Sequence, residues 1–149
     1  MASTYTTNIR LTKQGDGDNA NTWGEILNNV ISLVDQAVGT YTTITVGATS
    51  SVALTENSGS GDQARSAILE IAGTVGGAHT SIFVYLPSGA SKTYAIKNAV
   101  SANTTASDAV VLRVAGQTHG VTVPTGGIGY FFTNGTSVNS LNAAGFSAI

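Results

Sequence analysis

The spacing of apolar residues along the chain changes near Gly39 from a helical period to a strand period. Before Gly39, apolar residues recur every three or four positions, which is typical of an amphipathic helix. Thr22 followed by Glu25 has the spacing of a capping box, and Gly39 stands where a left-handed glycine commonly ends a helix. The pattern predicts one helix over residues 22–39.

The predicted helix carries two overlapping series of apolar residues. A surface helix of a single domain needs only one apolar stripe. We therefore expect one side of this helix to contact its own domain and the other side to contact another surface. The first series is Trp23, Ile26, Val30, Leu33 and Ala37, and the second is Leu27, Ile31, Val34 and Val38.

After Gly39, apolar and polar residues alternate in short runs that are separated by turn residues, which predicts strands. Pro87-Ser88-Gly89 and Pro124–Gly127 favour turns, and Asn134-Gly135 favours a hairpin. The fold class predicted is mainly β: a single β-sandwich (jelly-roll-like) or barrel domain preceded by one N-terminal α-helix. Sandwich and barrel share these local signals, so the choice between them stays open. The strand-like runs cover residues 41–46, 66–72, 81–86, 92–98, 109–114, 120–123, 128–133 and 137–138.

The same patterns divide the chain into four parts. These are an extended N-terminal arm (1–21), the helix (22–39), the β domain (40–140) and a C-terminal tail (141–149). With 149 residues, the chain has the size of one ordinary domain.

The chain has few charged residues, and this excludes some classes of function. Only 9% of the residues are charged, against about 25% in an average soluble domain, and the formal net charge is -2. A nucleic-acid-binding surface needs clustered Lys and Arg, which the chain lacks. No apolar run approaches the ~18 residues of a membrane span, and the polar start of the chain predicts no signal peptide. We expect neither a nucleic-acid nor a membrane partner.

Residues that could carry catalysis do not form a recognisable motif. Cysteine is absent, which excludes thiolate nucleophiles, disulfides and Cys-ligated metals. No nucleophile-elbow sequence supports a triad, so we predict no enzyme, no catalytic residue and no cofactor. The residues available for such a triad are His79, His119, Asp62, Asp108, Ser60 and Ser107.

Two loops resemble ligand sites only superficially. Asp16 and Asp18 stand in an acidic, glycine-containing stretch, but Ala20 and Leu27 occupy positions where a calcium loop needs oxygen ligands. A solvated turn is the better interpretation, and a nonstandard cation site near Asp16 and Asp18 stays open. The glycines at 126–129 precede a strand-like run and not a helix, so they do not form a phosphate loop. We predict no metal site.

Several segments, in order along the chain, resemble structural proteins of tailed bacteriophage particles, particularly modules of fibres and of head or tail decoration proteins. Together they span most of the chain between Asn21 and Val138. The segments are Asn21-Thr22-Trp23-Gly24 followed by Leu27-Asn28-Asn29-Val30-Ile31, then Asp62-Gln63-Ala64-Arg65-Ser66-Ala67-Ile68-Leu69, Ala95-Ile96-Lys97-Asn98-Ala99, Gly120-Val121-Thr122-Val123-Pro124 and Asn134-Gly135-Thr136-Ser137-Val138.

The resemblance implies a β-rich, non-enzymatic module that assembles as a trimer. It implies a capsid decoration (cement) or short head-fibre protein that binds itself, the major capsid protein or other virion proteins. Its location would be the capsid or tail surface of the virion, after assembly in the bacterial host cytoplasm. The chain ends at Ile149, soon after the last strand-like run, which favours an accessory protein over a long receptor-binding fibre. Head and tail locations stay open.

The alternative function is a tail-fibre or baseplate-associated protein, including a host-glycan-binding adhesin module. Glycan binding needs an exposed aromatic platform. The rings lie in strand-like runs, where core packing is the simpler role. The available rings are Tyr85, Tyr94, Tyr130, Phe131 and Phe132.

The predicted interface combines the helix with both ends of the chain. Apolar side chains in a terminal arm or tail contribute no burial energy while they face solvent, so we expect them to contact neighbouring chains. Docking of both ends on their own domain is the alternative. The predicted interface residues are Tyr5, Ile9, Leu11, Trp23, Ile26, Leu27, Val30, Val34, Leu141, Phe146 and Ile149.

Overall fold

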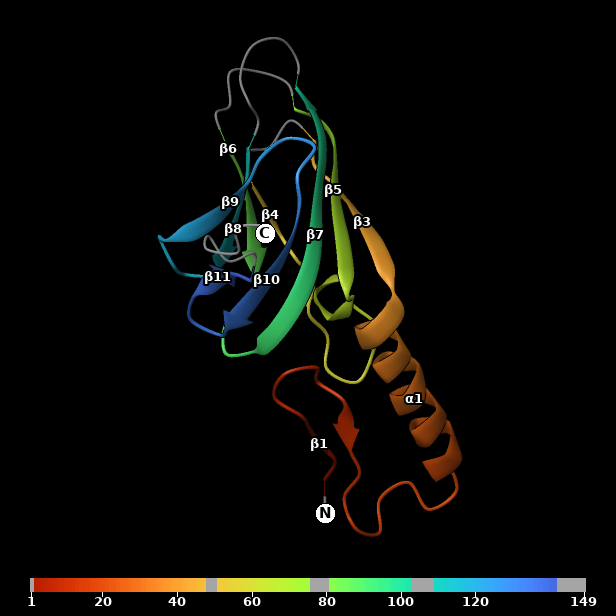
Figure 1. Cartoon of the computed structure of the whole chain (residues 1–149). Helices are drawn as coiled ribbons and strands as arrows, with labels where there is room; N and C mark the ends of the chain where they lie inside the picture. Colours follow the sequence, from red (N-terminus) through yellow and green to blue (C-terminus); the bar gives the residue numbers. More distant parts are fainter. Residues whose placement is uncertain (1, 48–50, 76–80, 103–108, 142–149) are drawn as a thin grey trace, which may run out of the picture.

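The computed structural model of the protein describes residues 2–47, 51–75, 81–102 and 109–141. Strands make up 45% and helices 16% of these residues, which confirms a mainly β fold with one α-helix. The strands form an upper body, and the helix and the N-terminal arm extend below it (Figure 1). A short hairpin in the arm pairs β1 (Thr4–Tyr5) with β2 (Thr12–Lys13).

The helix α1 (Trp23–Gly39) leads directly into the first long strand, β3 (Tyr41–Thr45). Neither predicted cap forms. The side chain of Thr22 makes no capping hydrogen bond, and Gly39 is a helical residue that does not adopt a positive φ. Thr40 ends the helix in an extended conformation while its N–H donates to the carbonyl oxygen of Gln36. The helix thus ends because the backbone enters β3 at once, with no room for a left-handed turn.

Most strands belong to one of two sheets. The five-stranded sheet has the order β11-β10-β7-β5-β3, and the four-stranded sheet has the order β4-β6-β8-β9. A single 3-10 turn, η1 (Gln63–Arg65), precedes β5. The remaining strands are β4 (Ser51–Ala53), β5 (Ile68–Val75), β6 (Ser81–Leu86), β7 (Ser91–Ala102), β8 (Ala109–Val114), β9 (Gly120–Val123), β10 (Ile128–Asn134) and β11 (Val138–Ser140).

The chain alternates between the two sheets from β3 to β8. Because each strand returns to its own sheet only after one strand in the other sheet, β3, β5 and β7 pair in parallel, as do β4, β6 and β8. Parallel pairing requires a crossover, which here is a strand of the opposite sheet and not a helix. A jelly roll consists of antiparallel Greek keys, so its strand order does not describe this chain. Neither sheet closes on itself in the described residues, and the barrel alternative is therefore wrong.

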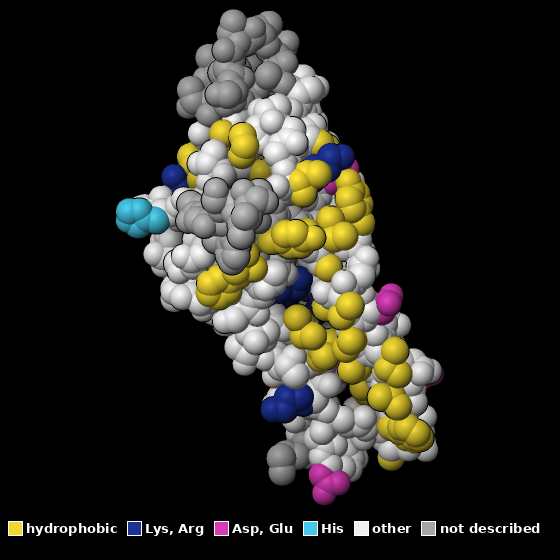
Figure 2. Space-filling model, in the orientation of Figure 1, with side chains coloured by type: hydrophobic (Ala, Val, Ile, Leu, Met, Phe, Trp, Pro, Cys, Tyr) yellow, Lys and Arg dark blue, Asp and Glu magenta, His cyan; other side chains and the backbone are white. Residues whose placement is uncertain are grey.

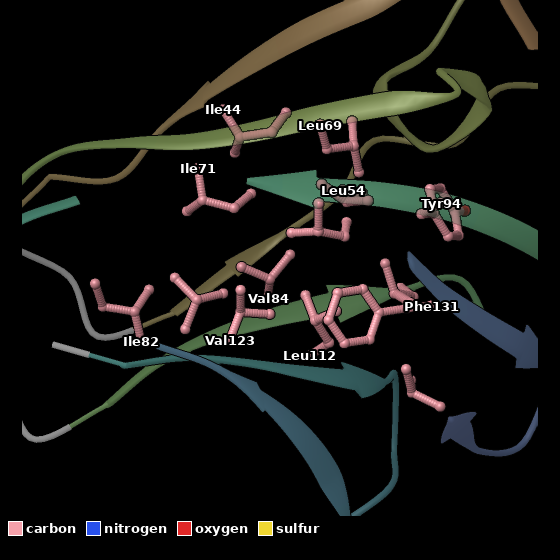
Figure 3. Packing of buried hydrophobic residues seen from close by; sticks show 14 of the residues in the cluster. Ile44, Leu54, Leu69, Ile71, Ile82, Val84, Tyr94, Leu112, Val123 and Phe131 are labelled. Atoms are coloured by element: carbon pink, nitrogen blue, oxygen red, sulfur yellow. The ribbon is translucent and has the colours of Figure 1, made fainter. Parts of the chain in front are cut away.

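The inner faces of the two sheets supply a shared apolar core (Figure 3). Along β6 and β8 every second residue is buried, as the alternating pattern predicts. Ile71 and Tyr94 of the five-stranded sheet point toward Val84 and Leu112 of the four-stranded sheet. The buried hydroxyl of Tyr94 donates to the carbonyl oxygen of Ala64 at 2.8 Å, so this polar atom is satisfied within the core.

The predicted hairpin at Asn134-Gly135 is confirmed, because it joins the antiparallel strands β10 and β11. Gly135 adopts φ +88, a conformation that favours glycine. The side-chain oxygen of Asn134 accepts hydrogen bonds from the N–H groups of Thr136 (3.0 Å) and Ser137 (2.9 Å). Local turn chemistry therefore sets this part of the fold.

Candidate functional site

The two apolar series of α1 have different surroundings. In the first series, Leu33 is buried, and Ile26, Val30 and Ala37 are half-buried against the rest of the chain. Only Trp23, at the start of the helix, is exposed in that series. All four members of the second series are exposed. The helix thus uses one side for its own domain and leaves an apolar side uncovered.

The exposed side of α1 continues onto the outer face of the five-stranded sheet (Figure 2). We call the whole surface the apolar band. Its helix part is Trp23, Leu27, Ile31, Val34 and Val38, and its sheet part is Tyr41, Ile68, Ile128, Tyr130 and Leu141.

Strand register aligns most of the sheet part in one row across the sheet. Tyr41 pairs with Ile68, Ile68 with Ala95, and Ala95 with Tyr130. Leu141 follows β11 and donates its N–H to the carbonyl oxygen of Tyr130. Residues directly opposite each other on neighbouring strands share one face of a sheet. The row therefore forms a continuous apolar strip perpendicular to the strands.

Charges on this face compensate one another. Lys97 Nζ lies 2.7 Å from Glu70 Oε1, and Glu70 also accepts hydrogen bonds from the hydroxyls of Tyr41 and Thr43. The hydrogen bond from Lys97 lowers the pKa of Glu70, and the same contact raises the pKa of Lys97. Both groups stay charged near neutral pH, so this pair adds no net charge to the face.

The apolar band is large for the surface of a single chain of this size. Its ten residues are between 37% and 75% exposed. On areas of about 150–250 Å² per large side chain, the exposed total is roughly 1,000 Å². The largest apolar patch of a typical monomer is about 300–600 Å², whereas each partner in a standard interface buries about 800 Å². The size of the band therefore matches a protein–protein contact.

A second cluster of residues, which we call the arm clasp, fastens the N-terminal arm to the β domain. At its centre the buried carboxylate of Asp62 accepts hydrogen bonds from Arg10 Nη2 at 3.1 and 2.9 Å and from the Arg65 N–H at 2.7 Å. Arg65 is fully buried and donates from Nε to the carbonyl oxygen of Ile9 at 2.8 Å. Its remaining nitrogens donate to the carbonyl oxygens of Asn57 and Ser60. Burial lowers the pKa of Arg65, and the charge of Asp62 opposes that shift.

Two side-chain amides join α1 to the loop at residues 59–62, which carries Asp62. Asn29 donates to the carbonyl oxygen of Gly59 at 2.8 Å, and Gln36 donates to that of Asp62 at 2.9 Å. These contacts anchor α1 beside the arm clasp and set the direction in which its exposed side faces.

The predicted interface residues therefore fall into three groups. Trp23, Leu27 and Val34 belong to the exposed side of α1, and Tyr5 and Leu141 are also exposed. Ile9, Leu11, Ile26 and Val30 are half-buried against their own chain. Phe146 and Ile149 lie outside the described residues. Near Ile9 the arm docks on its own domain, which is the second of the two alternatives for the arm. Sequence analysis missed the arm clasp and the sheet part of the band apart from Leu141.

Lys92 lies next to the arm clasp and gives a testable pH dependence. Its Nζ donates to the carbonyl oxygen of Ser66 at 2.9 Å, and burial followed by the charge of Arg10 lowers its pKa to about 8. An unfolded lysine keeps its proton up to about pH 10.4. Between pH 8 and 10 the unfolded state therefore binds more protons, so stability should rise with pH in this window.

Urea unfolding of the native protein and of Lys92→Met between pH 8 and 10 measures this effect. The free energy of unfolding should rise with pH more steeply in the native protein than in Lys92→Met. Equal slopes would show that Lys92 is not held in a site that disfavours its charge. The buried Tyr94, whose raised pKa acts in the opposite direction, titrates in the unfolded state only near the upper end of the window.

The residues considered for catalysis do not come together where the structure describes them. Asp62 is committed to the arm clasp, while His119 and Ser60 are exposed. His79, Ser107 and Asp108 lie outside the described residues. Asp16 is exposed and Asp18 accepts a hydrogen bond from Ser3. Within the described ranges, no three His, Asp or Glu side chains are placed to hold a metal ion, and no helix is long and apolar enough to cross a membrane.

The aromatic rings considered for glycan binding are dispersed. Tyr94 and Phe131 belong to the core, and Phe132 is half-buried. Tyr85 is half-buried on the four-stranded sheet, whereas Tyr130 is exposed on the other sheet. These five rings do not form one platform.

Comparison of the chain with protein-family models, with curated proteins and with solved structures gives no match.

Proposed function

We propose that this chain is a non-enzymatic structural subunit of a bacteriophage particle, and that it assembles as a homotrimer. The observation that carries the assembly is the exposed apolar side of α1. The assignment to a bacteriophage particle and the trimeric state come from the resemblance of the chain segments to phage structural modules. In this proposal the trimer decorates the capsid or forms a short head fibre, and its partners include the major capsid protein.

The spacing on α1 supports association with identical helices. Leu27, Ile31, Val34 and Val38 follow one another at intervals of four, three and four residues, as the core positions of a coiled coil do. Three of the four are β-branched and they occupy both kinds of core position. Isoleucine at both positions favours three or four strands, whereas β-branched residues at one position with leucine at the other favour two. These four residues combine both patterns, so the spacing supports association of identical helices and the number three rests on the resemblance.

The two sheets, in our proposal, are the layers of a single β-sandwich. The support is that buried residues from both sheets belong to one core cluster. Such a body has a continuous interior and can hold α1 in a fixed direction, as an assembling subunit requires.

Replacement of Ile31 or Val34 by Asp tests the assembly. The native protein should have the mass of three chains in sedimentation velocity, and each variant should sediment as a monomer. A buried, unpaired carboxylate is costly at an apolar contact, whereas both positions are exposed in the single subunit. The far-ultraviolet circular dichroism of the β domain should not change.

Ser32→Asp is the matched control. It introduces the same charge at an exposed position on the polar side of the same helix, so it should leave the trimer intact. A native protein that is monomeric at high concentration, or variants that assemble like the control, would refute the proposal.

The alternative is a tail-fibre or baseplate-associated protein, including a module with glycan-binding activity. The exposed ring of Tyr130 is the one observation in its favour. Electron microscopy of intact particles labelled with an antibody against the protein separates the two functions. Label at capsid-lattice sites supports decoration, and label at a distal tail position supports the alternative.

A further inference from the structure

The sheet part of the apolar band lies on the same side of the molecule as the exposed side of α1 (Figure 2). The two parts are joined by the chain itself, because Tyr41 follows the last helical residue after a single position. The row through Tyr41, Ile68 and Tyr130 crosses the sheet, and Ala95 stands on its middle strand, β7. A surface that covers the helix part is thus positioned to cover this row also.

We infer that the outer face of the five-stranded sheet packs against the same face of the other copies, so that one apolar core runs along the trimer axis from the helices to the sheets. This inference rests on the proposed trimer and adds a second contact to it. The occupant of the sheet face is a second copy of this chain.

The area of the band supports a contact larger than the helices alone. The helix part supplies about half of the roughly 1,000 Å² of exposed apolar surface, which is less than the ~800 Å² that each partner in a standard interface buries. A helix of 17 residues also offers few turns for a self-standing coiled coil. Addition of the sheet part brings the buried area into the standard range.

The charges of the sheet face fit a contact between identical surfaces. Identical surfaces repel each other when they carry net charge. Here Lys97 pairs with Glu70 within each subunit, so that contact between copies brings together compensated pairs. The opposite sheet differs on this point: its outward Arg113 lies over the ring of Phe83, 3.9 Å from the ring centroid, and no described acid pairs with it.

Single cysteines test the contact directly, since the natural chain has none. Ala95→Cys places a thiol at the middle of the row, and Ala109→Cys places one on the outward side of β8 in the other sheet. Both alanines are half-buried, so the two variants are matched. Ile31→Cys serves as the reference for the helix contact. Each full-length variant is treated with a short bis-maleimide reagent and separated on a denaturing gel.

Ala95→Cys and Ile31→Cys should both give covalent dimers, and Ala109→Cys should remain monomeric on the gel. Cross-linking at Ile31 without cross-linking at Ala95 would leave the helical trimer in place and overturn the sheet contact. A monomeric native mass in all three variants would refute the proposed trimer itself.

The chain after Leu141 is the other candidate occupant of this face. If Ala95→Cys cross-links only in a chain truncated after Leu141, the tail covers the face and the inference is wrong.

An independent variant is Ile128→Ser, which changes a side chain that is 67% exposed in the subunit. It should raise the dissociation concentration of the trimer by about tenfold, since interface anchors commonly contribute this much. An unchanged dissociation concentration would also count against the sheet contact.

Discussion

Replacement of Arg65 by Met should lower the free energy of unfolding by about 3–5 kcal/mol, the cost of breaking a buried charge pair from one side. The guanidinium is fully buried and donates to the carbonyl oxygens of Ile9, Asn57 and Ser60. Its loss leaves these acceptors without their donor and leaves Asp62 with Arg10 as its one remaining ion-pair partner in the described residues. Since Ile9 belongs to the arm, the arm should also detach.

Urea unfolding measures the stability of this variant, and limited proteolysis of residues 1–21 reports detachment of the arm. Lys13→Met is the control, because it removes a positive charge at an exposed position of the same arm. It should change stability by less than about 0.5 kcal/mol. A loss below about 1 kcal/mol in Arg65→Met, with the arm still protected, would show that the arm clasp does not hold the arm.

The second large effect is expected for Gly73→Ala in β5. Gly73 has φ +128, and a Cβ atom there would lie 2.2 Å from the carbonyl oxygen of Val46. That atom belongs to the backbone, where the Val46 N–H already donates to Ala72 at 2.8 Å, so relief requires the chain beyond β3 to move. A strained backbone costs about 1–3 kcal/mol, and displacement of packed neighbours adds a similar amount. We expect a loss of at least about 3 kcal/mol.

Gly24→Ala supplies a control of opposite sign. Gly24 lies in the first turn of α1, and a Cβ atom there meets nothing within 4 Å. Alanine should therefore stabilise the helix by about 0.5–1 kcal/mol. If thermal unfolding shows that Gly73→Ala stabilises the protein as Gly24→Ala does, the close approach to Val46 is not the reason for glycine at position 73.

The expected effects of these substitutions indicate that different residues determine the stability of the single chain and the assembly of the trimer. Arg65 is fully buried within its own chain, and Gly73 lies against the backbone of Val46 in the same chain. Ile31 and Val34 are exposed, so their replacement should separate the subunits while each subunit stays folded. This separation makes the assembly proposal testable, because loss of the trimer would not be a consequence of unfolding.

Local patterns in the sequence were sufficient for several features of this protein. The helical period before Gly39 predicted α1 and its two apolar sides, because side chains three and four residues apart share one face of a helix. Asn134-Gly135 predicted its hairpin, since a tight turn depends on a few adjacent residues. Alternation predicted strands with one buried side, which β6 and β8 show.

The tertiary structure alone decided how these elements combine. Alternation specifies which side of a strand is buried but not its neighbour or its direction, so the parallel pairing of β3, β5 and β7 was not predictable from it. The predicted glycine cap at Gly39 did not form because the helix continues almost directly into β3, and this connection overrode the local preference. The arm clasp forms only because the fold brings distant positions together: Arg10 and Asp62 are 52 residues apart, and Ile9 and Arg65 are 56 residues apart. The row across the five-stranded sheet likewise exists only through strand register, which no local window of the sequence contains.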